Sequence, residues 1–221
     1  MTAKTFYVTV SLLLFACLKN YTQQNFSKDI KSIKLLNSKT NSNYPVISFD
    51  DHLYLSFDDI EADEKNYYFK INHYDYQWNP SRLLKSEFLN GFDDIRIDNY
   101  KSSYNTLQSY THYKLKIPNN DFDFKVSGNY SVSVHLSNDQ KVFEKRFSVN
   151  ENLTSISMSI SRSNKIEDIK SSQNIDATIN CNNCTKIYNS SSILKLIIIK
   201  NNNWLNSRII DKPKHVLSNK L

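Results

Sequence analysis

The sequence predicts an all-β protein built around a β-sandwich, and three observations support this prediction. Short segments in which apolar and polar residues alternate recur at even spacing along the chain, as in the strands of a sandwich. No segment shows the longer periodicity of an extended amphipathic helix. The run Gly128-Asn129-Tyr130 at the start of one strand is typical of the tyrosine corner of immunoglobulin-like sandwiches, in which a tyrosine hydroxyl bonds to nearby backbone.

The first strands are expected on either side of residue 44. Residues 20–43 form a polar lead-in, within which four apolar residues between positions 30 and 36 indicate one edge strand. The first domain is then expected over residues 44–150. Its first strand begins at Tyr44 and continues through Leu53, Leu55 and Phe57, which alternate with polar residues.

The densest pattern lies between Tyr67 and Tyr113. Alternation over residues 67–73 predicts a half-buried strand. The following Trp78-Asn79-Pro80 predicts the start of a short helix, because Asn79 can cap free N–H groups and Pro80 is tolerated at the first helical position. Gly91 is expected to end that helix. Two more strands are predicted over residues 96–103 and 107–117.

A hairpin is predicted to close the first domain. Residues 130–136 and 143–149 both alternate, and Asn138-Asp139 between them suits a hairpin turn. After residue 150 a polar, serine-rich segment interrupts the strand pattern. Residues 151–221 are therefore predicted to form a partial second β domain, with strands near residues 156–160, 175–179 and 193–200.

The N-terminus predicts export. Residues 1–19 combine Lys4 with an apolar run of roughly 13 residues, which suits a signal peptide and is too short for a membrane-spanning helix of about 20. Cys17 also suggests a lipid-anchor site, although Phe15 is bulkier than the small residue usual there. We expect no membrane-spanning segment in the mature chain.

The charge pattern bears on the class of partner. The net charge of +6 comes from scattered lysines, and an arginine-rich stripe with interleaved aromatic residues is missing. This pattern argues against a nucleic-acid partner. A basic surface favours an acidic protein or the anionic side of an outer membrane.

No catalytic, cofactor-binding or metal-binding motif is found in the sequence. The five acidic residues between 58 and 64 are interpreted as an exposed turn, in preference to a catalytic carboxylate pair or a calcium loop. The five histidines lack metal-ligand spacing, and His73 is interpreted as a structural histidine on a strand face. With glycine only at Gly91 and Gly128, a glycine-rich phosphate loop is excluded.

Cys181 and Cys184 have the spacing of a redox motif or of half a zinc site. A second pair that would complete a zinc site is missing, and no strand-to-helix pattern follows them. In an exported chain we expect a local disulfide between these two cysteines.

Three blocks of the sequence resemble a known family. HYDYQWNPSRLLKSEFLNGF, YNTLQSYTHYKLKIPN and VSGNYSVSV, spread in order over residues 45–155, are similar to the N-terminal domain of the plug protein of the Bacteroidetes type IX secretion system. The resemblance implies an immunoglobulin-like β-sandwich in a non-enzymatic periplasmic protein that seals the outer-membrane translocon barrel from below. The family continues with further β structure, so the second domain is expected to be truncated. A cysteine common in the family near Tyr74 is missing here.

Two sets of residues match the family blocks and are predicted to contact the translocon. They are Trp78, Asn79 and Pro80 in the W-N-P block, and Asn105, Leu107 and Tyr110 in the N-T-L-Q-x-Y block. For Trp78, burial in the sandwich core is an alternative. The alternative function is an exported carbohydrate-binding or adhesive module in which the loop aromatics form a stacking platform. A third option is a glycan-acting enzyme that uses the acidic residues near position 59.

Overall fold

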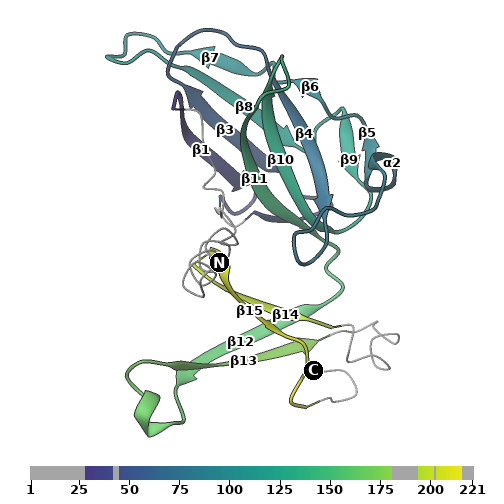
Figure 1. The fold of residues 1–221 in the computed structure, drawn as a ribbon, viewed down its shortest axis with the longest axis vertical. Coiled ribbons are helices and arrows are strands. Elements are labelled where there is room, and N and C mark those ends of the chain that lie inside the picture. The colour runs from purple at the N-terminus through teal and green to yellow at the C-terminus, as the bar shows by residue number, and fades with distance from the viewer. Residues whose placement is uncertain (1–27, 42–44, 181–193, 202, 216–221) are drawn as a thin grey trace, which may run out of the picture.

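The computed structural model describes residues 28–41, 45–180, 194–201 and 203–215, and its main feature is a sandwich of two β-sheets (Figure 1). One sheet has four strands, in the order β1 (Ile30–Asn37), β3 (Leu53–Asp59), β8 (Thr111–Ile117) and β7 (Tyr100–Ser102). The other has five, in the order β2 (Val46–Ser48), β11 (Lys141–Asn150), β10 (Gly128–Leu136), β4 (Tyr67–Tyr74) and β6 (Ile95–Arg96). The predicted all-β sandwich is confirmed.

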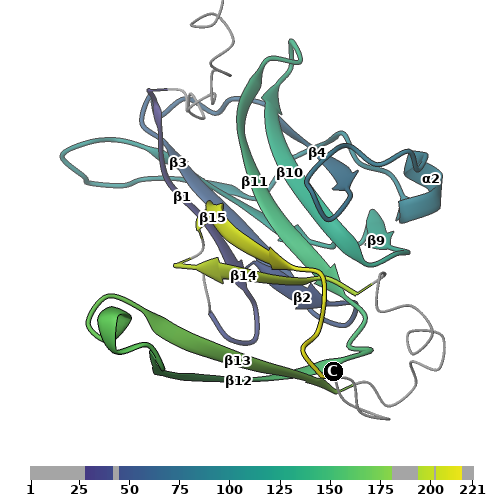
Figure 2. The ribbon, with the colours of Figure 1, turned by 60° about the horizontal axis from the view of Figure 1, so that its bottom comes forward.

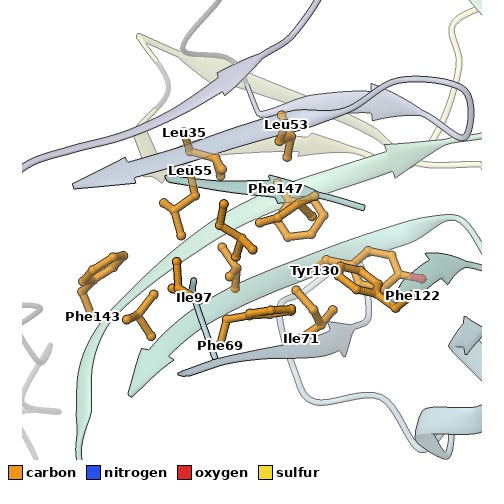
Figure 3. Close-up of a cluster of buried hydrophobic side chains, with 14 of the residues drawn as sticks. Leu35, Leu53, Leu55, Phe69, Ile71, Ile97, Phe122, Tyr130, Phe143 and Phe147 are labelled. Atoms are coloured by element: carbon orange, nitrogen blue, oxygen red, sulfur yellow. The ribbon is translucent and has the colours of Figure 1, made fainter. Parts of the chain in front are cut away.

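The core lies between these two sheets because the apolar residues of each strand alternate toward the other sheet. Figure 3 shows Leu53 and Leu55 from one sheet facing Phe69 and Ile71 from the other. At one end of the core, the ring of Phe57 stacks on Tyr113 with their centroids 5.0 Å apart. The rings of Phe57 and Tyr67 are nearly perpendicular, with their centroids 5.2 Å apart. Aromatic pairs of this geometry add to the stabilisation that burial alone provides.

The predicted closing hairpin and tyrosine corner are confirmed. Strands β10 and β11 pair antiparallel, and the turn between them includes Asp139 with a φ of 66°. Tyr130 is fully buried, and its hydroxyl donates a hydrogen bond of 2.7 Å to the backbone carbonyl of Val126. This bond satisfies the one polar atom of a side chain that otherwise fills the apolar core.

The predicted first strand of the domain is wrong in one respect. Residues 44–57 do not form one continuous strand, because β2 and β3 belong to different sheets. Strand β2 pairs in parallel with β11 at the edge of the five-stranded sheet, and the chain then crosses to the other layer. The edge strand expected within residues 30–36 is observed as β1, which pairs with β3.

The predicted helix start at Asn79 is also wrong. The helix α2 (Lys85–Phe88) begins at Lys85, and Pro80 instead forms an isolated β-bridge with Tyr74. Phe88 is buried, and Leu84 is exposed. Gly91 has the expected positive φ of 104°, yet it lies in a strand, because β5 (Leu89–Gly91) pairs with β9 (Phe122–Phe124). A Cβ at Gly91 would come within 2.1 Å of the Asp121 carbonyl oxygen, so this pairing requires glycine.

Among the described residues between 155 and 210, which we call the second β region, two hairpins follow the sandwich. One pairs β12 (Ser155–Arg162) with β13 (Gln173–Asn180), with the short helix η1 (Ile166–Asp168) in their connection. The other pairs β14 (Leu196–Lys200) with β15 (Asn203–Ile210). The two hairpins lie next to each other (Figure 2). Between them is a groove of about 480 Å³, with apolar side chains that include Ile179 and Ile198 in its walls. Within the described ranges, no helix is long and apolar enough to cross a membrane.

Candidate partner-docking loops

The residues predicted to contact the translocon fall into two loops, which the structure holds apart. We call residues 75–80 the WNP turn and residues 103–110 the NTLQ loop. The WNP turn follows the last residue of β4. The NTLQ loop leads into Thr111, which pairs with Asp59. Asp59 accepts a hydrogen bond from Tyr67, the first residue of β4, so the NTLQ loop lies near the start of β4. Eight residues of strand therefore separate the two loops by about 23 Å, so they do not form one compact surface.

The carboxylate of Asp75 organises the WNP turn. Its Oδ1 accepts the backbone N–H groups of Gln77 at 2.8 Å and Asn79 at 2.9 Å, and its Oδ2 accepts the Asn79 side chain at 3.1 Å. The backbone N–H of Asn79, followed by its side chain, lowers the pKa of Asp75. Asn79 thus closes an aspartate-centred turn and does not cap a helix. The sequence signal for this arrangement is Asp75 itself, whose role the sequence prediction missed.

Trp78 is half-buried against the face of the five-stranded sheet. Arg146 of β11 lies 4.5 Å from the centre of the indole, and the ring of Tyr74 lies 5.7 Å away. The backbone of Trp78 has a φ of 65°, a conformation that is uncommon for a bulky residue and that the Asp75 hydrogen bonds hold in place. Because its ring contacts the side chains of Arg146 and Tyr74, the main role of Trp78 is to stabilise the local fold.

The NTLQ loop is exposed but internally hydrogen-bonded. Ser103 and Tyr110 close its base, with the Ser103 N–H donating to the Tyr110 carbonyl at 2.8 Å and the Tyr110 N–H donating to the Ser103 hydroxyl at 2.9 Å. Thr106 donates to the Gln108 carbonyl at 2.9 Å, and the Gln108 amide reaches the Ile60 carbonyl at 3.1 Å. These bonds give the loop a defined conformation.

The tip of the NTLQ loop presents apolar side chains to solvent. Tyr104 is 94% exposed and Leu107 is fully exposed, so neither contributes to the core. Asn105 between them is exposed, with a φ of 55°, and Tyr110 at the base is half-buried. An ordered loop with an exposed tyrosine and leucine at its tip is a suitable contact surface for another protein.

The acidic residues that follow β3 form an ion cluster around Lys65. The interpretation as an exposed turn is wrong for Asp59, which is fully buried and accepts hydrogen bonds from the Tyr67 hydroxyl at 2.7 Å and from Lys65 Nζ at 3.1 Å. Lys65 also pairs with Glu61 and Asp63. Partial burial lowers the pKa of Lys65, but the Glu61 and Asp59 carboxylates outweigh it, and the net pKa is raised.

The carboxylates of this cluster are close enough to bind a metal cation, but the ammonium group of Lys65 occupies the position between them. Donor oxygens of Asp59, Glu61 and Asp63 lie within 4.8 Å of one another. The ammonium group of Lys65 bonds to all three, and the Tyr67 hydroxyl takes a further position on Asp59. The cluster therefore fastens the start of β4 to the end of β3, and its carboxylates serve as structural acceptors.

The predicted disulfide between Cys181 and Cys184, the signal peptide over residues 1–19 and the lipid-anchor site Cys17 all lie outside the described residues. They stay predictions. The same holds for the domain limits at residues 44, 150 and 221 and for the docking roles assigned to the two loops.

A solved structure shares this fold well beyond the sandwich. The crystal structure of a hypothetical protein from Parabacteroides merdae superposes with a TM-score of 0.80 and 31% sequence identity, over 88% of this chain. The match covers 50% of that protein, so the present chain spans about half its length. No curated protein matches this sequence.

The sandwich itself identifies the family. A family model described as the first domain of the Type 9 secretion system plug protein matches residues 30–151. This range begins at the first residue of β1 and ends just after β11, and so contains every strand of the two facing sheets. The chain therefore belongs to the type IX secretion system plug family.

Proposed function

We propose that this protein is a periplasmic, non-enzymatic component that plugs or gates the outer-membrane translocon of the type IX secretion system, and that the NTLQ loop makes the docking contact. The family supports a role in secretion and a protein partner from the secretion machinery. The observation that carries the docking assignment is the exposed apolar tip of an internally bonded loop, formed by Tyr104 and Leu107.

The WNP turn has a supporting role in this proposal. Of its three predicted contact residues, Asn79 and Pro80 are exposed, whereas Trp78 packs beside Arg146 and Tyr74. The turn also lies at the opposite end of β4 from the NTLQ loop. A translocon that binds the NTLQ loop could also contact the WNP turn only if its binding surface extended along the whole length of the sandwich.

The non-enzymatic part of the proposal is supported by the acidic cluster. Among the described residues, the carboxylates of Asp59, Glu61 and Asp63 are held by Lys65, and Asp59 also accepts the Tyr67 hydroxyl. The carbohydrate-binding alternative gains no specific support, because Trp78 and Tyr104 belong to loops at opposite ends of the sandwich and cannot share one stacking platform.

The test is affinity purification of a tagged copy from a bacterium that has the secretion system, with mass spectrometry of the copurified envelope proteins. We expect the large translocon barrel to be recovered. The double variant Tyr104→Ser with Leu107→Ser should reduce recovery at least about tenfold, which corresponds to a loss of about 1.4 kcal/mol in binding free energy.

The matched control is Phe92→Ser, which removes an exposed apolar side chain, 79% accessible, from a different turn. It should leave recovery unchanged. If the barrel is absent from the wild-type sample, the same experiment with a longer relative decides the outcome. Absence from that sample as well would contradict the plugging function. Equal loss with both variants would contradict the choice of loop.

A further inference from the structure

The outer face of the four-stranded sheet carries an ordered array of lysines. Its antiparallel register aligns outward side chains of adjacent strands in three rows across the sheet. The first row contains Lys31, Asp58, His112 and Lys101; the second contains Lys34, Ser56 and Lys114; the third contains Leu36, Tyr54 and Lys116. We call the five lysines of these rows, Lys31, Lys34, Lys101, Lys114 and Lys116, the lysine face.

A bulge in β1 creates part of this array. Lys31 pairs with Asp58 and Lys34 with Ser56, so two residues of β1 lie opposite the single residue Phe57. Ser32 within the bulge has a φ of 54°. Residues three apart in a regular strand point to opposite faces, but the inserted residue restores the alternation and places both lysines on the outer face.

The lysine face has little compensating negative charge. All five lysines are exposed, and none forms an ion pair with a carboxylate of the described residues. The single acidic side chain in the rows, Asp58, is bound to His112. On the five-stranded sheet, by contrast, Lys70 is paired with Asp94 and Asp139. Among the described residues, the lysine face is therefore a group of five positive charges without carboxylate partners.

The chemistry of this face favours a lipid surface over a protein surface. Protein interfaces are depleted in lysine and enriched in arginine and large aromatic anchors, whereas the charged residues here are lysines on an open sheet. Attraction to anionic lipid headgroups needs no fixed geometry, and each lysine near such a surface increases partition by about fivefold. Tyr54, which is 46% exposed in the third row, is suited to the interfacial region of a bilayer.

We propose that the lysine face binds the anionic phospholipid headgroups of a membrane surface, so that the four-stranded sheet lies against the bilayer. This orientation leaves the opposite sheet, with the WNP turn, facing away from the membrane. The contact is electrostatic and therefore weakens as salt screens the lysines. It is independent of the translocon contact, and it can be tested with the purified chain alone.

The experiment measures cosedimentation of the purified full chain with vesicles of phosphatidylglycerol and phosphatidylcholine, and with vesicles of phosphatidylcholine alone. At about 0.02 M salt we expect clear partition onto the anionic vesicles, most of which is lost at about 0.5 M salt. The vesicles of phosphatidylcholine alone report any binding through apolar segments of the chain.

The decisive variant is the triple change Lys34→Gln, Lys114→Gln and Lys116→Gln. It should lower the phosphatidylglycerol-dependent partition by about a hundredfold, from about fivefold for each lysine. The matched control, Lys165→Gln, Lys170→Gln and Lys200→Gln, removes the same charge from exposed positions of the second β region and should retain most of the binding. Circular dichroism of both variants checks that the sheets are intact.

Three outcomes would overturn the proposal. The first is equal partition onto anionic and neutral vesicles. The second is the same loss in both triple variants, which would show that net charge alone drives binding. The third is binding to a soluble acidic polypeptide such as polyglutamate, dependent on the lysine face, without binding to the anionic vesicles. That result would assign the face to an acidic protein.

Discussion

The sandwich and the second β region have similar strand patterns but very different burial. In both, apolar residues alternate with polar ones, and antiparallel pairs hold the strands together. In the sandwich the apolar faces of the two sheets meet, and residues such as Ile71 are fully buried. In the second β region the corresponding residues Ile156, Met158 and Ile160 of β12 are 56%, 59% and 56% exposed.

The difference shows that alternation determines which side chains share a face but not what covers that face. Among the described hydrophobic residues of the second β region, Ile179 alone reaches the exclusion from solvent that is common in the sandwich core. A groove of about 480 Å³ separates the two hairpins, whereas packed aromatic rings fill the space between the two sheets of the sandwich. Because burial of apolar area drives folding, the sandwich should account for most of the stability of the chain.

The largest expected contrast between the regions is at alkaline pH. Burial raises the pKa of Tyr113 to about 12 and also raises the pKa values of Tyr67 and Tyr130. An unfolded tyrosine ionises near pH 10, so the stabilisation from these protonated hydroxyls is complete below about pH 10. It is lost as the pH rises through about 12, and we expect the sandwich to unfold there.

Phenolate absorbance together with isoleucine methyl NMR signals measures this effect. The Ile71 signal should shift with the ionisation of the buried tyrosines. The Ile156 signal should not respond in the same step, because the described part of the second β region contains no tyrosine. Complete ionisation of all tyrosines while the Ile71 signal stays unchanged would contradict the prediction.

A matched pair of substitutions gives the next largest contrast. Ile71→Ala removes a fully buried side chain from β4 and should lower the free energy of unfolding by about 2–5 kcal/mol. Ile156→Ala makes the same chemical change at a position that is 56% exposed and should cost less than about 1 kcal/mol. Urea denaturation of both variants checks this. Similar losses would mean that β12 is covered in solution.

The smallest expected effect concerns the contact between the regions. Lys195, just before β14, donates a hydrogen bond of 2.8 Å to the Tyr76 hydroxyl, and its ammonium group lies 4.3 Å from the centre of that ring. Exposed cation–π contacts contribute about 0.5–1 kcal/mol. We expect Lys195→Ala to lower the stability of the sandwich by no more than this, with Lys195→Arg as the control that keeps the charge. A loss above about 2 kcal/mol in urea denaturation would show that the two regions unfold as one unit.

Sequence periodicity predicted the strands that span the core. The alternation expected in β4 is observed, and β8, within the strand predicted over residues 107–117, has Tyr113, Leu115 and Ile117 buried and Lys114 and Lys116 exposed. These strands are predictable because the fold buries one face of each over its full length. The tyrosine corner was predictable because its glycine and tyrosine are close in sequence.

Features that depend on contacts between distant residues were not predictable in the same way. The helix predicted at Asn79 failed because the Asn79 side chain is bound to Asp75 and the Ser81 N–H donates to the His73 carbonyl, so the chain pairs with the end of β4 instead of turning into a helix. The candidate docking residues match two family blocks, but their separation depends on which strands the blocks join. Likewise, the lysine face requires the register between β1, β3 and β8 in addition to the alternation of each strand.

The bulge in β1 also affects how the protein behaves at high concentration. Among the described residues, strand β1 is an edge of the four-stranded sheet, and backbone groups at such an edge can add a strand from another molecule. The irregular register at Ser32 and the flanking lysines oppose such addition. The opposite edge, β7, is just three residues long. The four-stranded sheet is thus protected at both edges against the addition of strands from other molecules.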